Sequence, residues 1–120
     1  MASGSLGQGL SVALGAATSK KLNGDPKIVY VLMGDGELQE GQNWEALMYG
    51  AAKGVDNIIA TIDYNQKQID GPVENVLSLG NLRAKLEAFG WLVLEMNGND
   101  MAEILEIGRA SCRERVSSPV

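Results

Sequence analysis

The chain has 120 residues, of which 45% are hydrophobic, so it is long and apolar enough to bury one domain core. Its net charge of −5, without any basic run, argues against nucleic acid or a membrane surface as a partner. The only cysteine is Cys112, so the chain has no disulfide framework, which fits a cytoplasmic setting. It has no histidine, so this chain alone supplies no histidine-based site.

Helices and strands alternate in the predicted secondary structure. Apolar residues at helical spacing are interleaved with short, mostly β-branched apolar runs, and glycines follow the helical segments. In chain order, the pattern predicts a helix over residues 6–22, a strand over 28–33, a helix over 44–52, a strand over 57–63, a helix that Ser78 caps and Gly90 ends, a strand over 91–96, and a short helix capped by Asp100. Strands separated by single helices favour an α/β fold in which a parallel sheet carries helices on both faces.

The last part of the chain follows a different pattern. After Leu105 the helical periodicity is lost, and residues 106–116 resemble the translation of a common sequencing-library adapter. We therefore expect residues 106–120 to be a non-native tail with few buried contacts and no regular structure. Residues 1–105 are expected to form part of one domain.

A glycine-flanked aspartate follows the first predicted strand. Gly34-Asp35-Gly36 lies where a parallel strand ends and a helix is about to begin, which is the edge at which open α/β sheets bind ligands. The glycines let the backbone pass close to a bulky anion, and the N–H groups at the start of the next helix attract it. One carboxylate in such a place suits a phosphate-bound Mg²⁺, which takes few protein carboxylates.

The loop after the second predicted strand supplies the other part of this site. Asn65 follows Asp35 by 65 − 35 = 30 residues. Because neighbouring parallel strands end at the same edge of a sheet, we expect the two side chains to lie close enough to share a metal. An amide oxygen and a backbone carbonyl from this loop would complete the protein ligands.

Other glycine and acidic clusters have simpler interpretations. Gln39 stands where a dinucleotide-binding G-x-G-x-x-G motif needs its third glycine, so we assign no nicotinamide or flavin site. The glycines at positions 4, 7 and 9 have the wrong spacing for a dinucleotide site and no strand before them, and close helix packing is the simpler interpretation. We interpret Glu37 and Glu45 as a solvated acidic helix start, which the helix dipole favours.

Several stretches of the sequence resemble one enzyme family. The pairing of Gly34-Asp35-Gly36 with Asn65 resembles the thiamine diphosphate motif, which opens with Gly-Asp-Gly and closes on Asn. Further segments are similar to transketolases, most of all to the form that is split into two shorter subunits: SGSLGQGL (3–10), GDGELQEGQ (34–42), WEA (44–46), QIDG (68–71) and FGW (89–91). The resemblance covers residues 2–105.

This resemblance implies roles for the residues that match the family's motifs. Asp35 and Asn65 correspond to side-chain metal ligands, and Lys67 to a residue whose backbone carbonyl binds the metal. The residues implied to contact the cofactor are Gly4, Leu6, Gly34, Asp35, Gly36 and Asn65. Glu40 matches a glutamate at a dimer interface, where it supports the partner's activating glutamate. No residue of this chain is implied to be catalytic.

The resemblance also implies an activity and partners. The chain would belong to an enzyme of the pentose phosphate pathway that transfers a two-carbon ketol unit between sugar phosphates, with thiamine diphosphate and Mg²⁺ as cofactors. The enzyme would be completed by a second copy across a dimer interface and by a pyrimidine-domain subunit. Because the family's histidines and activating glutamate lie outside this sequence, we expect the 120-residue chain to be inactive alone.

Two alternatives stay open from the sequence. The first is another thiamine diphosphate enzyme, such as a deoxyxylulose-phosphate synthase or a 2-oxo-acid dehydrogenase E1 component. The second is a truncated, inactive chain that binds only metal-diphosphate or a partner subunit.

Overall fold

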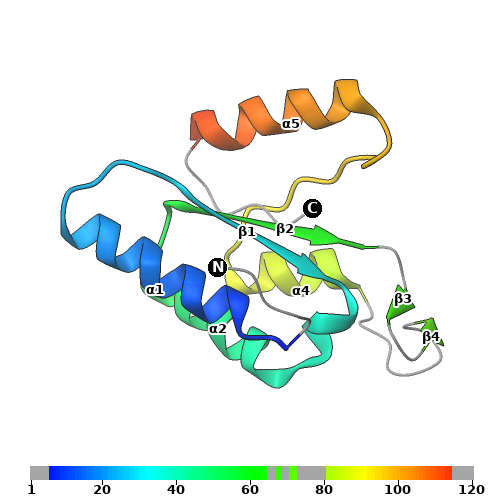
Figure 1. Ribbon diagram of the computed structural model, residues 1–120, viewed down its shortest axis with the longest axis horizontal. Coiled ribbons are helices and arrows are strands. Elements are labelled where there is room, and N and C mark those ends of the chain that lie inside the picture. Colours follow the sequence, from blue (N-terminus) through cyan, green and yellow to red (C-terminus); the bar gives the residue numbers. More distant parts are fainter. Residues whose placement is uncertain (1–5, 65–66, 69–70, 73–80, 115–120) are drawn as a thin grey trace.

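The fold is built on a pair of parallel strands (Figure 1). A computed structural model describes residues 6–64, 67–68, 71–72 and 81–114 of the chain. Strand β1 (Val29–Gly34) pairs with β2 (Ile58–Asp63) in an unbroken register, from Val29 opposite Ile58 to Gly34 opposite Asp63. Because the two strands end together, the segments that follow them start at the same edge of the sheet.

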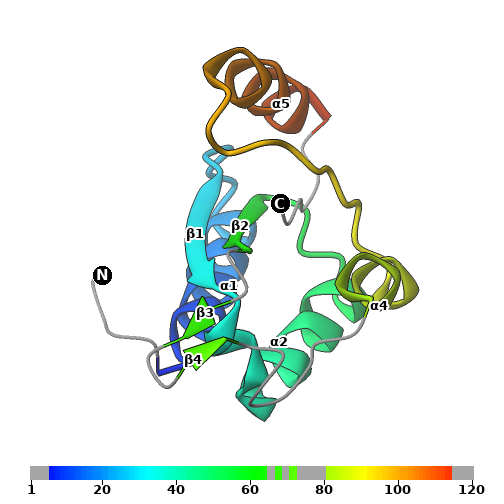
Figure 2. The ribbon, with the colours of Figure 1, turned by 90° about the vertical axis from the view of Figure 1, so that its right-hand side faces the viewer.

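Helices lie on both sides of this pair (Figures 1 and 2). The remaining elements, in chain order, are α1 (Gly9–Leu22), the 3₁₀ helix η1 (Gly36–Gln39), α2 (Gly41–Ala52), the short antiparallel strands β3 (Lys67–Gln68) and β4 (Gly71–Pro72), α4 (Leu82–Phe89) and α5 (Met101–Glu114). Helices α1 and α2 lie on one side of the strands, and α5 lies on the other side. The predicted α/β class, with a parallel sheet between helices, is confirmed for this part of the chain.

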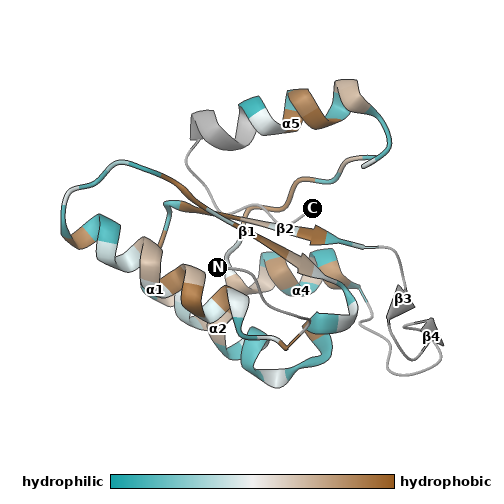
Figure 3. Cartoon of the chain, in the orientation of Figure 1, coloured by the Kyte–Doolittle hydropathy of each residue, from teal (hydrophilic) through white to brown (hydrophobic). Residues whose placement is uncertain are grey.

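The hydrophobic core lies between the two strands and the helices α1 and α2. Figure 3 shows apolar residues along β1, β2 and α1. Leu10 and Leu14 of α1, Leu47 of α2 and Ile58 of β2 are buried in one cluster. Each such side chain stabilises the fold by roughly 1.5–3 kcal/mol relative to an exposed position.

The opposite face of β1 is largely uncovered. Tyr30 and Leu32 are 63% and 73% exposed, and their partners across the register are Ile59 and Thr61. These positions alternate with the buried ones, as expected when successive side chains of a strand point to opposite faces. Helix α5 leaves this face of β1 open to solvent.

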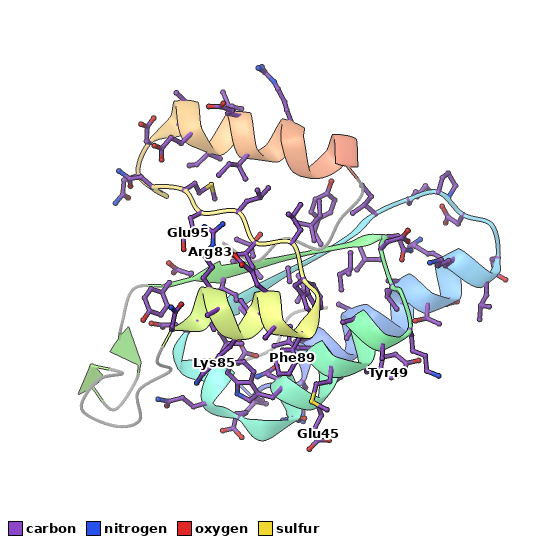
Figure 4. All side chains as sticks on the ribbon, turned by 180° about the vertical axis from the view of Figure 1, so that it is seen from behind. Glu45, Tyr49, Arg83, Lys85, Phe89 and Glu95 are labelled. Carbon is purple, nitrogen blue, oxygen red and sulfur yellow. The ribbon has the colours of Figure 1, made fainter. Side chains whose placement is uncertain are left out.

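Helix α4 is fixed at both ends and along one side. Asn81 caps its start by accepting the Ala84 N–H at 3.1 Å, and Gly90 ends it with φ of +103°. Figure 4 shows Arg83 directed toward Glu95, to which it makes an ion pair of 3.5 Å. The predicted cap, Ser78, lies outside the described residues.

The predicted strand over residues 91–96 is wrong. The segment is extended but pairs with no strand among the described residues. Trp91 and Val93 instead enter the core, and the indole Nε1–H of Trp91 donates to the carbonyl of Leu47 at 3.0 Å. Arg83 Nη2 donates to the Val93 carbonyl at 3.5 Å, and the Trp91 N–H donates to the Leu86 carbonyl at 3.1 Å, so groups of α4 occupy two backbone polar groups that a strand would use.

The C-terminal region also differs from the prediction. Asp100 caps α5, as expected, by accepting the Ala102 N–H at 3.0 Å. The helix then continues to Glu114, so the expected lack of regular structure after Leu105 is wrong as far as that residue. The side chains of residues 106–109 are exposed or half-buried, which agrees with the predicted scarcity of buried contacts. Over the described residues, the structure contains no helix with the length and apolarity needed to span a membrane.

Candidate cofactor site

Asp35 lies at the end of β1, immediately beyond the sheet. Its side chain is only 1% exposed, and its Oδ1 accepts the Gly36 N–H at 2.9 Å. The Asp35 N–H donates to the carbonyl of Asp63 at 3.3 Å, which ties this position to the end of β2. Burying a carboxylate is costly unless hydrogen bonds or a cation compensate it, and in this structure the Asp35 carboxylate is hydrogen-bonded as the N-cap of η1.

A 3₁₀ helix separates this aspartate from α2. The sequence predicts a helix over residues 44–52; in the structure α2 begins earlier, at Gly41, and η1 (Gly36–Gln39) precedes it. The tighter turn buries Leu38 completely in the core. The buried Asn43 side chain then donates to the carbonyl of Glu37 at 2.7 Å, which fixes η1 against the first turn of α2. The N–H groups nearest to Asp35 therefore belong to η1.

The N-terminal glycine segment lies against this turn. Gly7 is buried with φ of +76°, and its N–H donates to Glu37 Oε1 at 3.1 Å. Gln42 Nε2 donates to the carbonyl of Leu6 at 2.9 Å. Leu6 itself is 58% exposed, and Gly4 lies outside the described residues. Gly7 is therefore packed closely against the start of α2, and the role of this segment toward a cofactor stays a prediction.

The interpretation of Glu37 as a solvated helix start is wrong. Glu37 is half-buried, and its carboxylate accepts two backbone N–H groups, from Gly7 at 3.1 Å and from Gly34 at 3.4 Å. Both residues lie in the segment GDGELQEGQ (34–42), but the sequence assigns no contact to Glu37 or Gln42, because the groups that they bind lie 30 and 36 residues away. Only a three-dimensional arrangement identifies them.

The loop after β2 is described in part. Asn65 lies outside the described residues, so its predicted approach to Asp35 stays a prediction. Lys67 opens β3, which pairs with β4 and packs against η1. The backbone of Lys67 is therefore brought to the side of the sheet on which Asp35 lies.

Glu40 lies beside the glycine segment at the start of α2. Its side chain is exposed, and a Cβ added to Gly7 would come within 2.9 Å of the Glu40 Cβ. An exposed carboxylate at this place is accessible to a partner, and its predicted role at a dimer interface stays a prediction.

The oxygen atoms at this edge that could bind a metal fit a hard cation bound to a phosphate. They are oxygen atoms from one buried carboxylate and from backbone, which is the set that Mg²⁺ uses when phosphates and water fill its other positions. A Cβ added to Gly34 would meet no atom within 4 Å, so the strand end has room above it. Across the described part of the chain, no three Asp, Glu, Cys or His side chains gather into a metal cluster.

The parallel strands between helices place this chain among the open α/β domains, a class that binds ligands at the carboxyl ends of its strands. A family model described as transketolase, thiamine diphosphate binding domain, matches residues 1–118. The chain therefore belongs to the transketolase family, through its thiamine diphosphate binding domain, and the resemblance found in the sequence is confirmed.

Similar proteins agree with this assignment. The chain is 48% identical over 107 residues to one subunit of the apulose-4-phosphate transketolase of Phocaeicola vulgatus, and 43% identical over 105 residues to a 6-deoxy-6-sulfo-D-fructose transketolase subunit of a Clostridium species. The aligned parts cover 89% and 88% of this chain but only 38% of either relative. The crystal structure of transketolase from Campylobacter jejuni matches all of this chain and 20% of that chain, with a TM-score of 0.87 and 32% identity.

Proposed function

We propose that this chain forms the part of a transketolase that binds the diphosphate and Mg²⁺ of thiamine diphosphate. The complete enzyme would transfer a two-carbon ketol unit between sugar phosphates. The observation that supports this proposal most directly is the buried Asp35 at the joint end of β1 and β2, in a chain of the thiamine diphosphate binding family.

The residues of the chain would bind and orient the cofactor. Asp35, Asn65 and the Lys67 carbonyl would hold the metal, and the backbone of Gly4, Leu6, Gly34 and Gly36 would surround the diphosphate. When bound, thiamine diphosphate supplies the carbon nucleophile that accepts and releases the two-carbon unit. In this structure the Gly36 N–H donates to Asp35 at 2.9 Å, which keeps this backbone donor beside the carboxylate that would hold the metal.

A partner subunit would complete the enzyme. The relatives from Phocaeicola and Clostridium are described as transketolase subunits, and the chain spans 38% of their length. Their names refer to a sugar phosphate and to a sulfo-sugar, which supports a phosphorylated or similarly anionic sugar as substrate. The partners would be a second copy of the chain, with Glu40 at the interface between copies, and the pyrimidine-domain subunit.

The test is metal-dependent binding of thiamine diphosphate, measured by isothermal titration calorimetry with and without Mg²⁺. Asp35→Asn keeps the size of the side chain and an acceptor for Gly36 but removes the charge. We expect it to weaken binding on the order of 100-fold, because hydrogen bonds and contacts to charged groups contribute up to about 3 kcal/mol.

The matched control is Asp56→Asn. Asp56 is an exposed residue that pairs with Lys21 at 3.2 Å. It lies before the start of β2, at the edge of the sheet opposite to Asp35, so its variant should bind as the wild type does. Equal binding by the Asp35 and Asp56 variants would refute the proposed site. Binding of Mg²⁺-diphosphate without ketol transfer, even when the rest of the enzyme and its partner are supplied, would favour the alternative of an inactive binding module.

A further inference from the structure

We infer that Glu37 is a positioning residue for the cofactor, which holds the Leu6–Gly7 turn against the strand end that carries Asp35. This inference rests on the proposed function of the site. The group of contacts formed by Leu6, Gly7, Gly34, Glu37 and Gln42 is called here the glycine-turn clamp.

The clamp joins two segments that are far apart in the sequence. The carboxylate of Glu37 accepts the Gly7 N–H at 3.1 Å through Oε1 and the Gly34 N–H at 3.4 Å through Oε2. Gly34 directly precedes Asp35, so the same side chain contacts the turn and the strand end. Gln42 adds a second link, from its Nε2 to the Leu6 carbonyl at 2.9 Å.

The clamp is itself rigidly supported. The carbonyl of Glu37 accepts the Nδ2 group of Asn43, a fully buried side chain, at 2.7 Å. Gly7 has φ of +76°, and a Cβ there would lie 2.9 Å from both Glu40 Cβ and Gln42 Nε2. Only glycine therefore lets the turn approach α2 this closely. A loop that is held before the ligand arrives loses less conformational entropy on binding.

The charge of Glu37 makes this role testable by the sign of an effect. A carboxylate that acted on a diphosphate directly would repel it, so removing the charge would strengthen binding. If the carboxylate instead holds backbone N–H groups, removing its charge weakens diphosphate binding, because the Leu6–Gly7 turn is then free to move. The two roles therefore predict changes of opposite direction for Glu37→Gln.

The experiment compares thiamine diphosphate binding by Glu37→Ala, Glu37→Gln and Gly7→Ala in the 120-residue chain at saturating Mg²⁺. We expect Glu37→Ala to weaken binding about 10- to 100-fold, the range for hydrogen bonds to a charged group. Glu37→Gln keeps one acceptor oxygen and should restore part of that loss. In a separate Mg²⁺ titration, at thiamine diphosphate concentrations that saturate each variant, the Mg²⁺ midpoint should be unchanged in all three, because Asp35 is untouched. Glu95→Gln, an exposed position with only a 3.5 Å contact to Arg83, is the matched control.

Hydrogen exchange of the Gly7 amide gives a second measurement that needs no cofactor. Without ligand, this N–H should exchange at least about 10-fold faster in Glu37→Ala than in wild type, and at the wild-type rate in Asp35→Asn and Glu95→Gln. Gly7→Ala breaks the clamp from its other side, so Glu37→Ala added to Gly7→Ala should weaken binding little further. The urea midpoint of each variant shows whether it is folded, and Glu37→Gln is the variant of choice if Glu37→Ala is not.

The outcomes separate this inference from the proposed function. Wild-type binding with equal or tighter binding by Glu37→Gln and Gly7→Ala would overturn the role of Glu37 and leave the site intact. A second outcome is that the wild type does not bind thiamine diphosphate, while the Gly7 amide exchanges fast only in the Glu37 variants. The clamp would then be formed, but the proposed function, and with it the role of the clamp in cofactor binding, would be overturned.

Discussion

Gly50 of α2 is a position where the usual effect of replacing a helical glycine should be reversed. Gly50 is buried where α2 meets α1 and the segment around Trp91. A Cβ there would lie 3.0 Å from Leu14 Cδ2 and 3.2 Å from Trp91 Cζ2, both closer than normal van der Waals contact. Leu14 is 2% exposed, and Trp91 is held by its hydrogen bond to Leu47, so neither side chain has room to withdraw.

The sign of the effect follows from two opposing contributions. Replacing glycine by alanine inside a helix stabilises it by about 1 kcal/mol. Forcing an extra carbon into a packed core costs about 1–3 kcal/mol. We therefore expect Gly50→Ala to lower the free energy of unfolding by about 1 kcal/mol, taking the middle of the second range.

Gly15→Ala is the matched control. Gly15 lies inside α1, is exposed, and would place its Cβ with no atom within 4 Å. It should gain the helix propensity alone, so the two variants should differ by about 2 kcal/mol, or about 8 °C in Tm for a chain of this size. Thermal and urea unfolding followed by circular dichroism measures both. A Gly50→Ala protein as stabilised as Gly15→Ala would refute the packing argument.

Three further predictions follow from the same structure. The 120-residue chain with thiamine diphosphate and Mg²⁺ should show no ketol transfer between pentose phosphates, even when a pyrimidine-domain subunit is supplied. Turnover in that assay would contradict the assignment of the catalytic groups to other segments. Asn81→Ala should lower the free energy of unfolding by about 1 kcal/mol in urea, since the Ala84 N–H loses its cap; an unchanged urea midpoint would show that α4 needs none. The backbone N–H of Lys27 and the ammonium of Lys20 lower the pKa of the Asp25 carboxyl. The stabilising contribution of the Asp25 carboxylate should be complete above the unfolded-state pKa of about 3.9 and should be lost as the pH falls through the lower folded-state pKa. An NMR titration that gives Asp25 a pKa at or above the unfolded-state value would exclude this contribution.

Local sequence patterns predicted the elements that depend on local chemistry. The apolar runs of β1 and β2 and the periodicity of α1 and α2 determine those elements, because each pattern reports which face is buried. The position of Asp35 followed from the same reasoning, since a parallel strand has to end at the ligand edge of the sheet.

The parts that sequence reasoning missed depend on distant partners. The segment around Trp91 has the composition of a strand, but Leu86 and Arg83 of α4 bond to its backbone and it pairs with no strand in the described structure. Glu37 has the appearance of a surface residue until Gly7, 30 residues away, is placed against it. The sequence does not predict the length of α5, because the residues after Leu105 have the pattern of a non-native tail rather than of a helix.

The exposed face of β1 affects how the protein has to be handled in solution. Tyr30 and Leu32 place aromatic and aliphatic surface in water, and such surface promotes association between molecules in a purified sample. The net charge of −5 opposes that association by mutual repulsion, which is strongest at low ionic strength because salt screens it. Sulfate or phosphate buffers strengthen apolar association as well as screening charge. The preparation should therefore be most monodisperse in dilute, low-salt buffer near neutral pH, and should associate first when salt is added to promote crystals.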